Sequence, residues 1–180
     1  GGKAMAAVLD ATEHLPLHAE IMSGYTGVRI TNLSIADMTD EEVEAVRRLV
    51  AEYCVAVFPG QFVEPEDHLA CIARFGPIMS TPGVDMHTDY EHLHMVANRG
   101  DPEKPMSGGF HTDTCFVAKP PSFTSLAAVE IPDHGGDTVF CNQYLAYETL
   151  SEVMQGWLKG LRFKHVVSGT DRPEEVPDPI

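Results

Sequence analysis

The stretch GFHTDTCFVAKPPSFTSLAAVEIPDHGGDT, residues 109–138, carries most of the information about the fold. Its middle part, residues 123–131, contains aromatic and β-branched residues and predicts a strand. Residues 133–136 predict a turn, because two consecutive glycines allow backbone conformations that strain other residues. Extended structure is predicted to resume at residues 138–141.

The triplet His111-Thr112-Asp113 precedes the predicted strand. In extended backbone, alternate side chains point to the same face, so His111 and Asp113 can offer a nitrogen and an oxygen to one cation. One further histidine would complete the two-histidine, one-carboxylate triad that holds iron(II) and leaves positions open for other ligands. An H-x-D triplet alone is a weak signal, because most such pairs are chance features of a surface.

A second H-T-D triplet begins at His87, and a zinc site built from His87, Asp89, His92 and His94 is an alternative. This copy lies in an irregular stretch, residues 77–107, without an apolar strand to hold ligands rigidly. A metal site needs ligands that are fixed by a packed scaffold. We therefore assign the metal to the later triplet and interpret the earlier one as polar loop residues.

The upstream part predicts helices as well as strands. Thr39 is suited to cap a helix whose apolar spacing continues to Tyr53, and Arg47 and Arg48 are expected to be solvated on it. The other predicted elements are strands at residues 28–33, 54–58, 94–97 and 161–167 and helices at 65–74 and 143–159. These elements indicate a mainly β fold with flanking helices, a cupin-like jelly roll or double-stranded β-helix. It is incomplete here, because a jelly roll needs eight strands.

Length and composition set further limits. The 180 residues fit a single domain, residues 1–180, in which residues 1–4 are expected to be a cloning remnant and residues 77–107 an irregular active-site segment. The net charge of −15 argues against nucleic acid or anionic membranes as partners. Without a secretory signal, a membrane span or a C-x-x-C pair, we expect a cytoplasmic protein with free thiols. The sequence is compatible with a homo-oligomer.

Residues 108–165 resemble the taurine dioxygenase (TauD/TfdA) family of iron(II)/2-oxoglutarate oxygenases. The shared features are an aromatic residue before H-T-D, a Phe three residues after the Asp, and Pro-Pro before a strand ending in V-E-I-P. G-G-D-T and a helix containing A-Y-E-x-L follow in the same order. Upstream, VAVFPGQ at residues 55–61 and R-F-G at residues 74–76 are similar to the family's early strand and helix end.

This resemblance implies a dioxygenase that uses Fe(II), 2-oxoglutarate and O2 to hydroxylate an unactivated C–H bond of a small organic substrate, releasing succinate and CO2. His111 and Asp113 correspond to the first two iron ligands, and a carboxylate at the second position argues against halogenation. Thr138 corresponds to a threonine that helps to bind a 2-oxoglutarate carboxylate. The positions that line the substrate pocket in relatives are occupied here by Ser80, Thr81 and Ser107.

The family's third iron ligand, a histidine, and its 2-oxoglutarate arginine are expected beyond residue 180, so the chain is expected to stop early. Neither His134 nor His165 is expected to replace that histidine. Alternatives on the same iron site are desaturation, cyclisation or epimerisation in natural-product biosynthesis. A non-catalytic jelly-roll binding module and the zinc-binding protein are alternatives of other classes.

Overall fold

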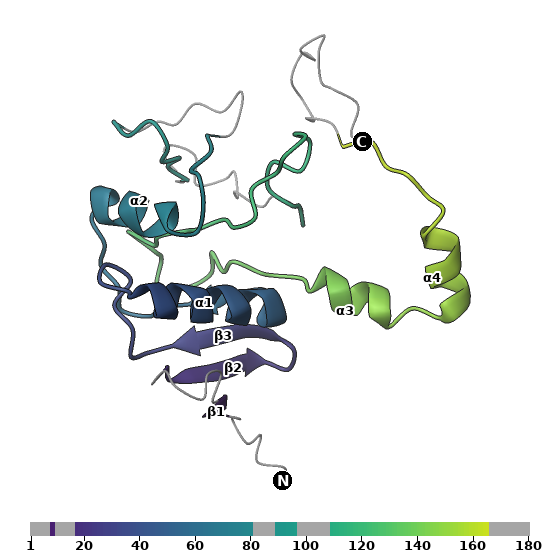
Figure 1. The fold of residues 1–180 in the computed structure, drawn as a ribbon, viewed down its shortest axis with the longest axis horizontal. Coiled ribbons are helices and arrows are strands. Elements are labelled where there is room, and N and C mark those ends of the chain that lie inside the picture. The colour runs from purple at the N-terminus through teal and green to yellow at the C-terminus, as the bar shows by residue number, and fades with distance from the viewer. Residues whose placement is uncertain (1–7, 10–16, 81–88, 97–108, 166–180) are drawn as a thin grey trace. The chain divides into compact units, whose positions relative to one another are not determined.

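The computed structural model describes residues 8–9, 17–80, 89–96 and 109–165, which are drawn in colour in Figure 1. The chain divides into two compact units. The first unit comprises residues 1–77 and 127–149, and the second comprises residues 78–126 and 150–180.

A small sheet forms the base of the first unit. Its strands, in spatial order, are β1 (Val8–Leu9), β2 (Ala19–Ser23), β3 (Thr26–Ile30) and β4 (Ala56–Val57). The β1–β2 and β2–β3 pairs are antiparallel, whereas β3 and β4 are parallel. The predicted strands at residues 28–33 and 54–58 are thus confirmed in place, although β3 begins and ends earlier than expected and β4 is shorter.

Helix α1 (Asp40–Tyr53) begins directly after Thr39, as predicted. The Thr39 hydroxyl oxygen accepts a hydrogen bond from the Glu42 amide at 3.2 Å, and the Glu42 carboxylate accepts one from the Thr39 amide at 2.7 Å. This reciprocal pair satisfies two backbone donors that the helix itself leaves unpaired. Helix α2 (Pro65–Ala73) also matches its prediction and begins with a proline, whose fixed backbone angle suits a first helical turn.

The core lies between α1 and the sheet, and α1 runs alongside β3 in Figure 1. Apolar residues recur along one face of α1 at helical spacing and meet the inward side chains of β3. Burying each large side chain contributes about 1.5–3 kcal/mol. The buried cluster consists of Leu17, Ala19, Val28, Ile30, Leu33, Met38, Val43, Ala45, Val46, Leu49 and Tyr53.

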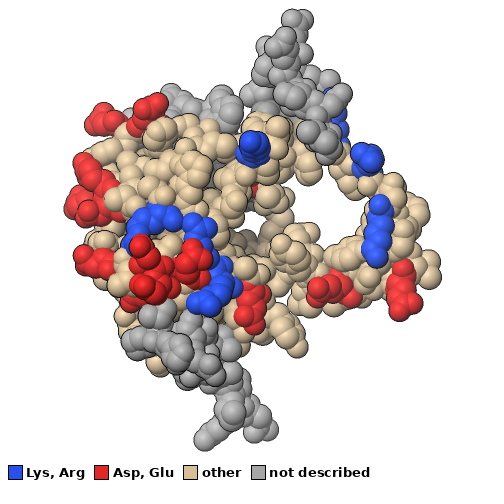
Figure 2. All heavy atoms as spheres, in the orientation of Figure 1, with Lys and Arg blue, Asp and Glu red and all other residues tan. Residues whose placement is uncertain are grey.

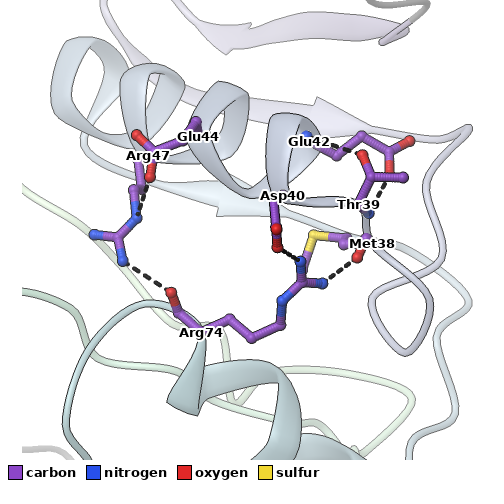
Figure 3. A network of polar contacts seen from close by, with 7 residues as sticks. All are labelled: Met38, Thr39, Asp40, Glu42, Glu44, Arg47 and Arg74. Carbon is purple, nitrogen blue, oxygen red and sulfur yellow. Dashed lines mark hydrogen bonds and ion pairs between the residues drawn. The ribbon is translucent and has the colours of Figure 1, made fainter.

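Two arginines connect the end of α2 to α1 (Figure 3). The Arg74 guanidinium donates to the Met38 carbonyl and forms an ion pair with Asp40 at 2.5 Å. In return, Nη2 of Arg47 donates to the Arg74 carbonyl at 2.9 Å, and the Arg47 guanidinium lies 5.3 Å from the centre of the Phe75 ring. The expectation that Arg47 is solvated is therefore wrong, because its side chain is only 28% exposed.

Acidic and basic side chains mix over the region of α1 in Figure 2. The first turn of this helix holds Asp40, Glu41 and Glu42, and negative charge at a helix N-terminus is favourable because the backbone amides there carry partial positive charge.

Among the described helices, none is both long and apolar enough to cross a membrane.

The described residues of the strands that the sequence predicts downstream do not form strands. In the part of the chain that the structure describes, residues 94–96, 123–131, 138–141 and 161–165 are irregular, so the described residues show a small sheet with helices and not an eight-stranded jelly roll. A strand needs a hydrogen-bonded neighbour, and residues 123–131 have none among the described residues. Apolar side chains of this segment are accordingly exposed to solvent, with Val129 95% and Ile131 74% exposed.

The helix predicted at residues 143–159 is interrupted and consists of α3 (Gln143–Glu148) and α4 (Glu152–Leu158). Ser151 causes the break, because its hydroxyl accepts a hydrogen bond from the Met154 amide at 3.3 Å and so starts a new helix. Asn142 caps α3 by accepting from the Leu145 amide at 3.0 Å.

Candidate active site

His111 and Asp113 lie together in the second unit, as predicted from their spacing. Nε2 of His111 is 3.1 Å from Oδ1 of Asp113, and their side chains are 70% and 44% exposed. The segment is not extended throughout, as the prediction from alternate spacing supposes, because a turn begins at Asp113 and extends over residues 113–116. The two side chains nevertheless lie on one side of the chain, because Nε2 of His111 and Oδ1 of Asp113 face each other.

The backbone of Gly109 determines which nitrogen of His111 is available. Its carbonyl oxygen lies 3.0 Å from Nδ1 of His111. A carbonyl oxygen can only accept, so Nδ1 carries a proton and donates it, and Nε2, which has a lone pair when the ring is neutral, faces Asp113. Metal-binding histidines commonly have such a partner on the second nitrogen, because it fixes the tautomer and the ring orientation. Sequence reasoning missed this contact.

The charge of the pair favours a cation between the two side chains. The Gly109 carbonyl, and after it the Asp113 carboxylate, raise the pKa of His111, because both stabilise the imidazolium. Without a proton on Nε2, two electron-rich atoms face each other across 3.1 Å and repel, so either a proton or a metal ion relieves the repulsion. One imidazole nitrogen and one carboxylate oxygen are donors that iron(II) accepts, so the residues present fit this metal.

The predicted third donor lies outside the described residues. Among these residues, no group of three or more His, Cys, Asp or Glu side chains is arranged to hold a metal ion. Nδ1 of His165 lies 3.3 Å from Sγ of Cys115, a contact that connects two segments of the second unit.

The competing zinc site is not supported where it can be assessed. Asp89, His92 and His94 belong to no metal-binding group within the described residues, and His87 lies outside them. Nδ1 of His92 instead contacts the Ser80 hydroxyl at 2.7 Å.

Two of the three residues predicted to line the substrate pocket, Thr81 and Ser107, lie outside the described residues. The third, Ser80, is half-buried, and its hydroxyl also donates to the Glu91 carbonyl at 3.3 Å. These contacts order the segment around Ser80, and its role toward a substrate stays a prediction.

Thr138 belongs to the first unit and is exposed. The glycines before it adopt left-handed backbone, with φ of 77° at Gly135 and 73° at Gly136, as the predicted turn requires. A side chain at Gly136 would also crowd the Pro132 ring, whose Cγ would lie 3.3 Å from the added Cβ. The turn is therefore confirmed, while the contact between Thr138 and 2-oxoglutarate stays a prediction.

Comparison with known proteins shows the family to which the chain belongs. The model of the family described as "Taurine catabolism dioxygenase TauD, TfdA family" matches residues 13–179. Since the match covers most of the chain, the chain belongs to the TauD/TfdA family.

Individual relatives give the same result. The chain is 31% identical over 150 residues to the alpha-ketoglutarate-dependent sulfonate dioxygenase of Saccharomyces cerevisiae, a match that covers 77% of this chain and 36% of the relative. It is 27% identical over 166 residues to the alpha-ketoglutarate-dependent 2,4-dichlorophenoxyacetate dioxygenase of Cupriavidus pinatubonensis, covering 83% of this chain and 56% of the relative. Alpha-ketoglutarate is another name for 2-oxoglutarate.

A solved structure supports the fold. The crystal structure of a taurine dioxygenase from Burkholderia xenovorans is similar with a TM-score of 0.64 and 27% identity, over 80% of this chain and 51% of that protein. The chain therefore has a TauD-like fold, and it spans about half the length of this relative.

Proposed function

We propose that the protein is an Fe(II)- and 2-oxoglutarate-dependent dioxygenase that hydroxylates an unactivated C–H bond of a small organic substrate and releases succinate and CO2. The observation that carries the proposal is the 3.1 Å approach of His111 Nε2 to Asp113 Oδ1, with the other imidazole nitrogen held by Gly109. Membership of the TauD/TfdA family supports it, and so do the relatives that are named alpha-ketoglutarate-dependent dioxygenases.

Each residue has a defined part in this proposal. Gly109 keeps a proton on Nδ1 of His111, so that Nε2 can donate its lone pair to the metal. Asp113 contributes a negatively charged oxygen that offsets part of the metal's charge. When bound, iron(II) and 2-oxoglutarate would activate dioxygen for oxidation of the substrate. A histidine from outside the described residues completes the metal site, and the Thr138 hydroxyl donates to a carboxylate of 2-oxoglutarate.

The proposal extends to the complete fold. We infer that residues 123–131 and 138–141 are strands of a jelly roll in the whole protein, paired with neighbours outside the described residues. The exposure of Val129 and Val139, 95% and 67%, supports this, because β-branched side chains are stabilised when a packed sheet buries them. A small-molecule substrate, a cytoplasmic location and the absence of nucleic-acid and membrane partners belong to the same proposal.

Turnover of 2-oxoglutarate by the intact protein tests the function. The protein is supplied with Fe(II), ascorbate and 2-oxoglutarate, and succinate is measured over a panel of sulfonates, sulfate esters, aryloxy acids, amino acids and natural-product intermediates. Sulfonates and 2,4-dichlorophenoxyacetate come first, because two relatives are named for them. We expect substrate-stimulated succinate and a product that has gained one oxygen atom.

Variants and products discriminate between the alternatives. His111→Ala should abolish stimulated turnover, whereas His94→Ala, which removes an exposed histidine outside the pair, should leave it unchanged. A product that has lost two hydrogens and gained no oxygen would indicate desaturation or cyclisation on the same iron. No stimulated succinate across the panel would contradict the proposal and favour the binding module.

A further inference from the structure

Thr114, which directly follows Asp113, has an unusual backbone conformation. Its φ is +48°, in the left-handed region. Residues with a side chain rarely adopt this region, and β-branched residues such as threonine adopt it least readily, because the side chain crowds the backbone. Conformations of this kind persist only where the surrounding structure imposes them, and they concentrate at functional sites.

Thr114 is also distinguished by its burial. It is 8% exposed, and the other residues of the described segment 109–165 are all half-buried or exposed. Its carbonyl accepts a hydrogen bond from the Val117 amide at 3.4 Å, so the turn closes on Thr114 itself. An anchored residue in a turn therefore stands next to an open metal-binding pair.

The anchor matters because exposed side chains are otherwise free to rotate. Asp113 is joined to Thr114 by one rigid peptide unit, so the backbone angles at Thr114 influence where the Asp113 carboxylate can point. A metal ion bound by two mobile side chains must immobilise both of them, which weakens binding. A fixed turn at Thr114 removes part of that loss before the metal arrives.

We propose that Thr114 is a positioning residue of the metal site, which holds the Asp113 carboxylate at Nε2 of His111 through its left-handed backbone. This inference rests on the proposed function, because it takes His111 and Asp113 as ligands. It predicts that, once the anchored threonine side chain is removed, metal affinity follows the ease with which the replacing residue at position 114 adopts positive φ.

A pair of substitutions isolates the backbone contribution. Thr114→Gly and Thr114→Ala both remove the threonine side chain, and only glycine adopts the left-handed region without strain. The intact protein is titrated anaerobically with Co(II), a probe for the iron site, and visible absorption gives the dissociation constant. We expect Thr114→Gly to bind within about threefold of the wild type and Thr114→Ala about tenfold more weakly than Thr114→Gly, from the left-handed preference of glycine.

Thr112 provides the matched control, because it is exposed and is not among the residues with positive φ. There the order should reverse, since glycine only adds flexibility: Thr112→Ala should bind at least as tightly as Thr112→Gly. Melting temperatures of the metal-free variants are measured in parallel. A purely structural role would lower the melting temperature of Thr114→Ala without changing its Co(II) affinity well below that temperature.

Two results overturn the proposal, and they differ in what else they affect. Equal Co(II) affinities for Thr114→Gly and Thr114→Ala, with binding still lost in His111→Ala, would reject the role of Thr114 and leave the metal site intact. Co(II) binding that is unchanged in His111→Ala would reject both the metal site and the positioning role.

Discussion

The carbonyl of Gly109 accepts a hydrogen bond from Nδ1 of His111 at 3.0 Å, which directs the other nitrogen of that imidazole toward Asp113. A backbone atom therefore fixes the tautomer of the neutral imidazole. Proton and metal then compete for one place between Nε2 and the carboxylate. This competition leads to the first prediction.

In the metal-free protein, the pKa of His111 should lie above its ordinary value and should fall when Asp113→Asn removes the carboxylate charge. It should not fall fully to the ordinary value, because the Gly109 carbonyl is the larger cause of the shift. NMR titration of the imidazole measures both values, with His94→Gln to assign an exposed histidine. An unchanged pKa in Asp113→Asn would show that the pair is not in contact.

The same shift makes metal binding depend on pH. Because the raised pKa favours the imidazolium, metal affinity should fall as the pH is lowered through the pKa of His111, and binding should release a proton. Calorimetry of Co(II) binding in buffers of different ionisation enthalpy counts that proton. Binding without proton release at a pH below the measured pKa would contradict the competition.

Because of His68 on α2, the free energy of unfolding should fall as the pH is lowered. A histidine paired with a carboxylate would have the opposite effect. Burial lowers its pKa in the folded state, so the unfolded chain binds more protons at mildly acidic pH. The contribution of neutral His68 is present above the ordinary pKa of 6.5 and is lost as the pH falls below it. Urea unfolding of the intact protein at pH 7.5 and 5.5 measures the loss, which His68→Gln should reduce and His94→Gln should not.

Arg74 should stabilise the protein mainly through its contact with a backbone carbonyl. Its partner Asp40 is 96% exposed, so the ion pair contributes little, whereas the Met38 carbonyl loses a charged donor when Arg74 is removed. We expect Arg74→Ala to lower the free energy of unfolding by about 1–3 kcal/mol. Denaturant unfolding measures it, with Arg48→Ala, an exposed arginine on α1, as the control. Equal effects of the two substitutions would contradict this role.

Thr39→Ala should lower the free energy of unfolding by about 1 kcal/mol, because it removes the acceptor for the Glu42 amide at the start of α1. Thr39→Ser keeps that oxygen and should cost much less. Thermal unfolding of the two variants, compared with the wild type, tests the capping arrangement. A serine variant as unstable as the alanine variant would show that the methyl group, and not the hydroxyl, matters.

The features that sequence predicts well are those that neighbouring residues determine. Helix α1 is recognisable from Thr39, its acidic first turn and its apolar spacing, all within one segment. The strand predicted at residues 123–131 depends on a partner strand that its own residues do not specify. The break at Ser151 was missed because a serine can either continue a helix or cap a new one.

The same distinction applies to the candidate site. The alternate spacing of His111 and Asp113 is visible in the sequence and predicts that their side chains face each other, as they do in the structure. The Gly109 carbonyl belongs to the backbone, and the positive φ of Thr114 contradicts the preference of its residue type. Neither could be predicted from residue identity.

The central claim is that His111 and Asp113 bind iron(II) together, and anomalous scattering at the iron edge tests it most directly. Crystals of the intact protein are grown without oxygen and soaked with Fe(II) and 2-oxoglutarate. The account predicts a single strong peak that is coordinated by Nε2 of His111 and a carboxylate oxygen of Asp113. Iron bound elsewhere, with neither of these side chains in contact with it, would contradict the account.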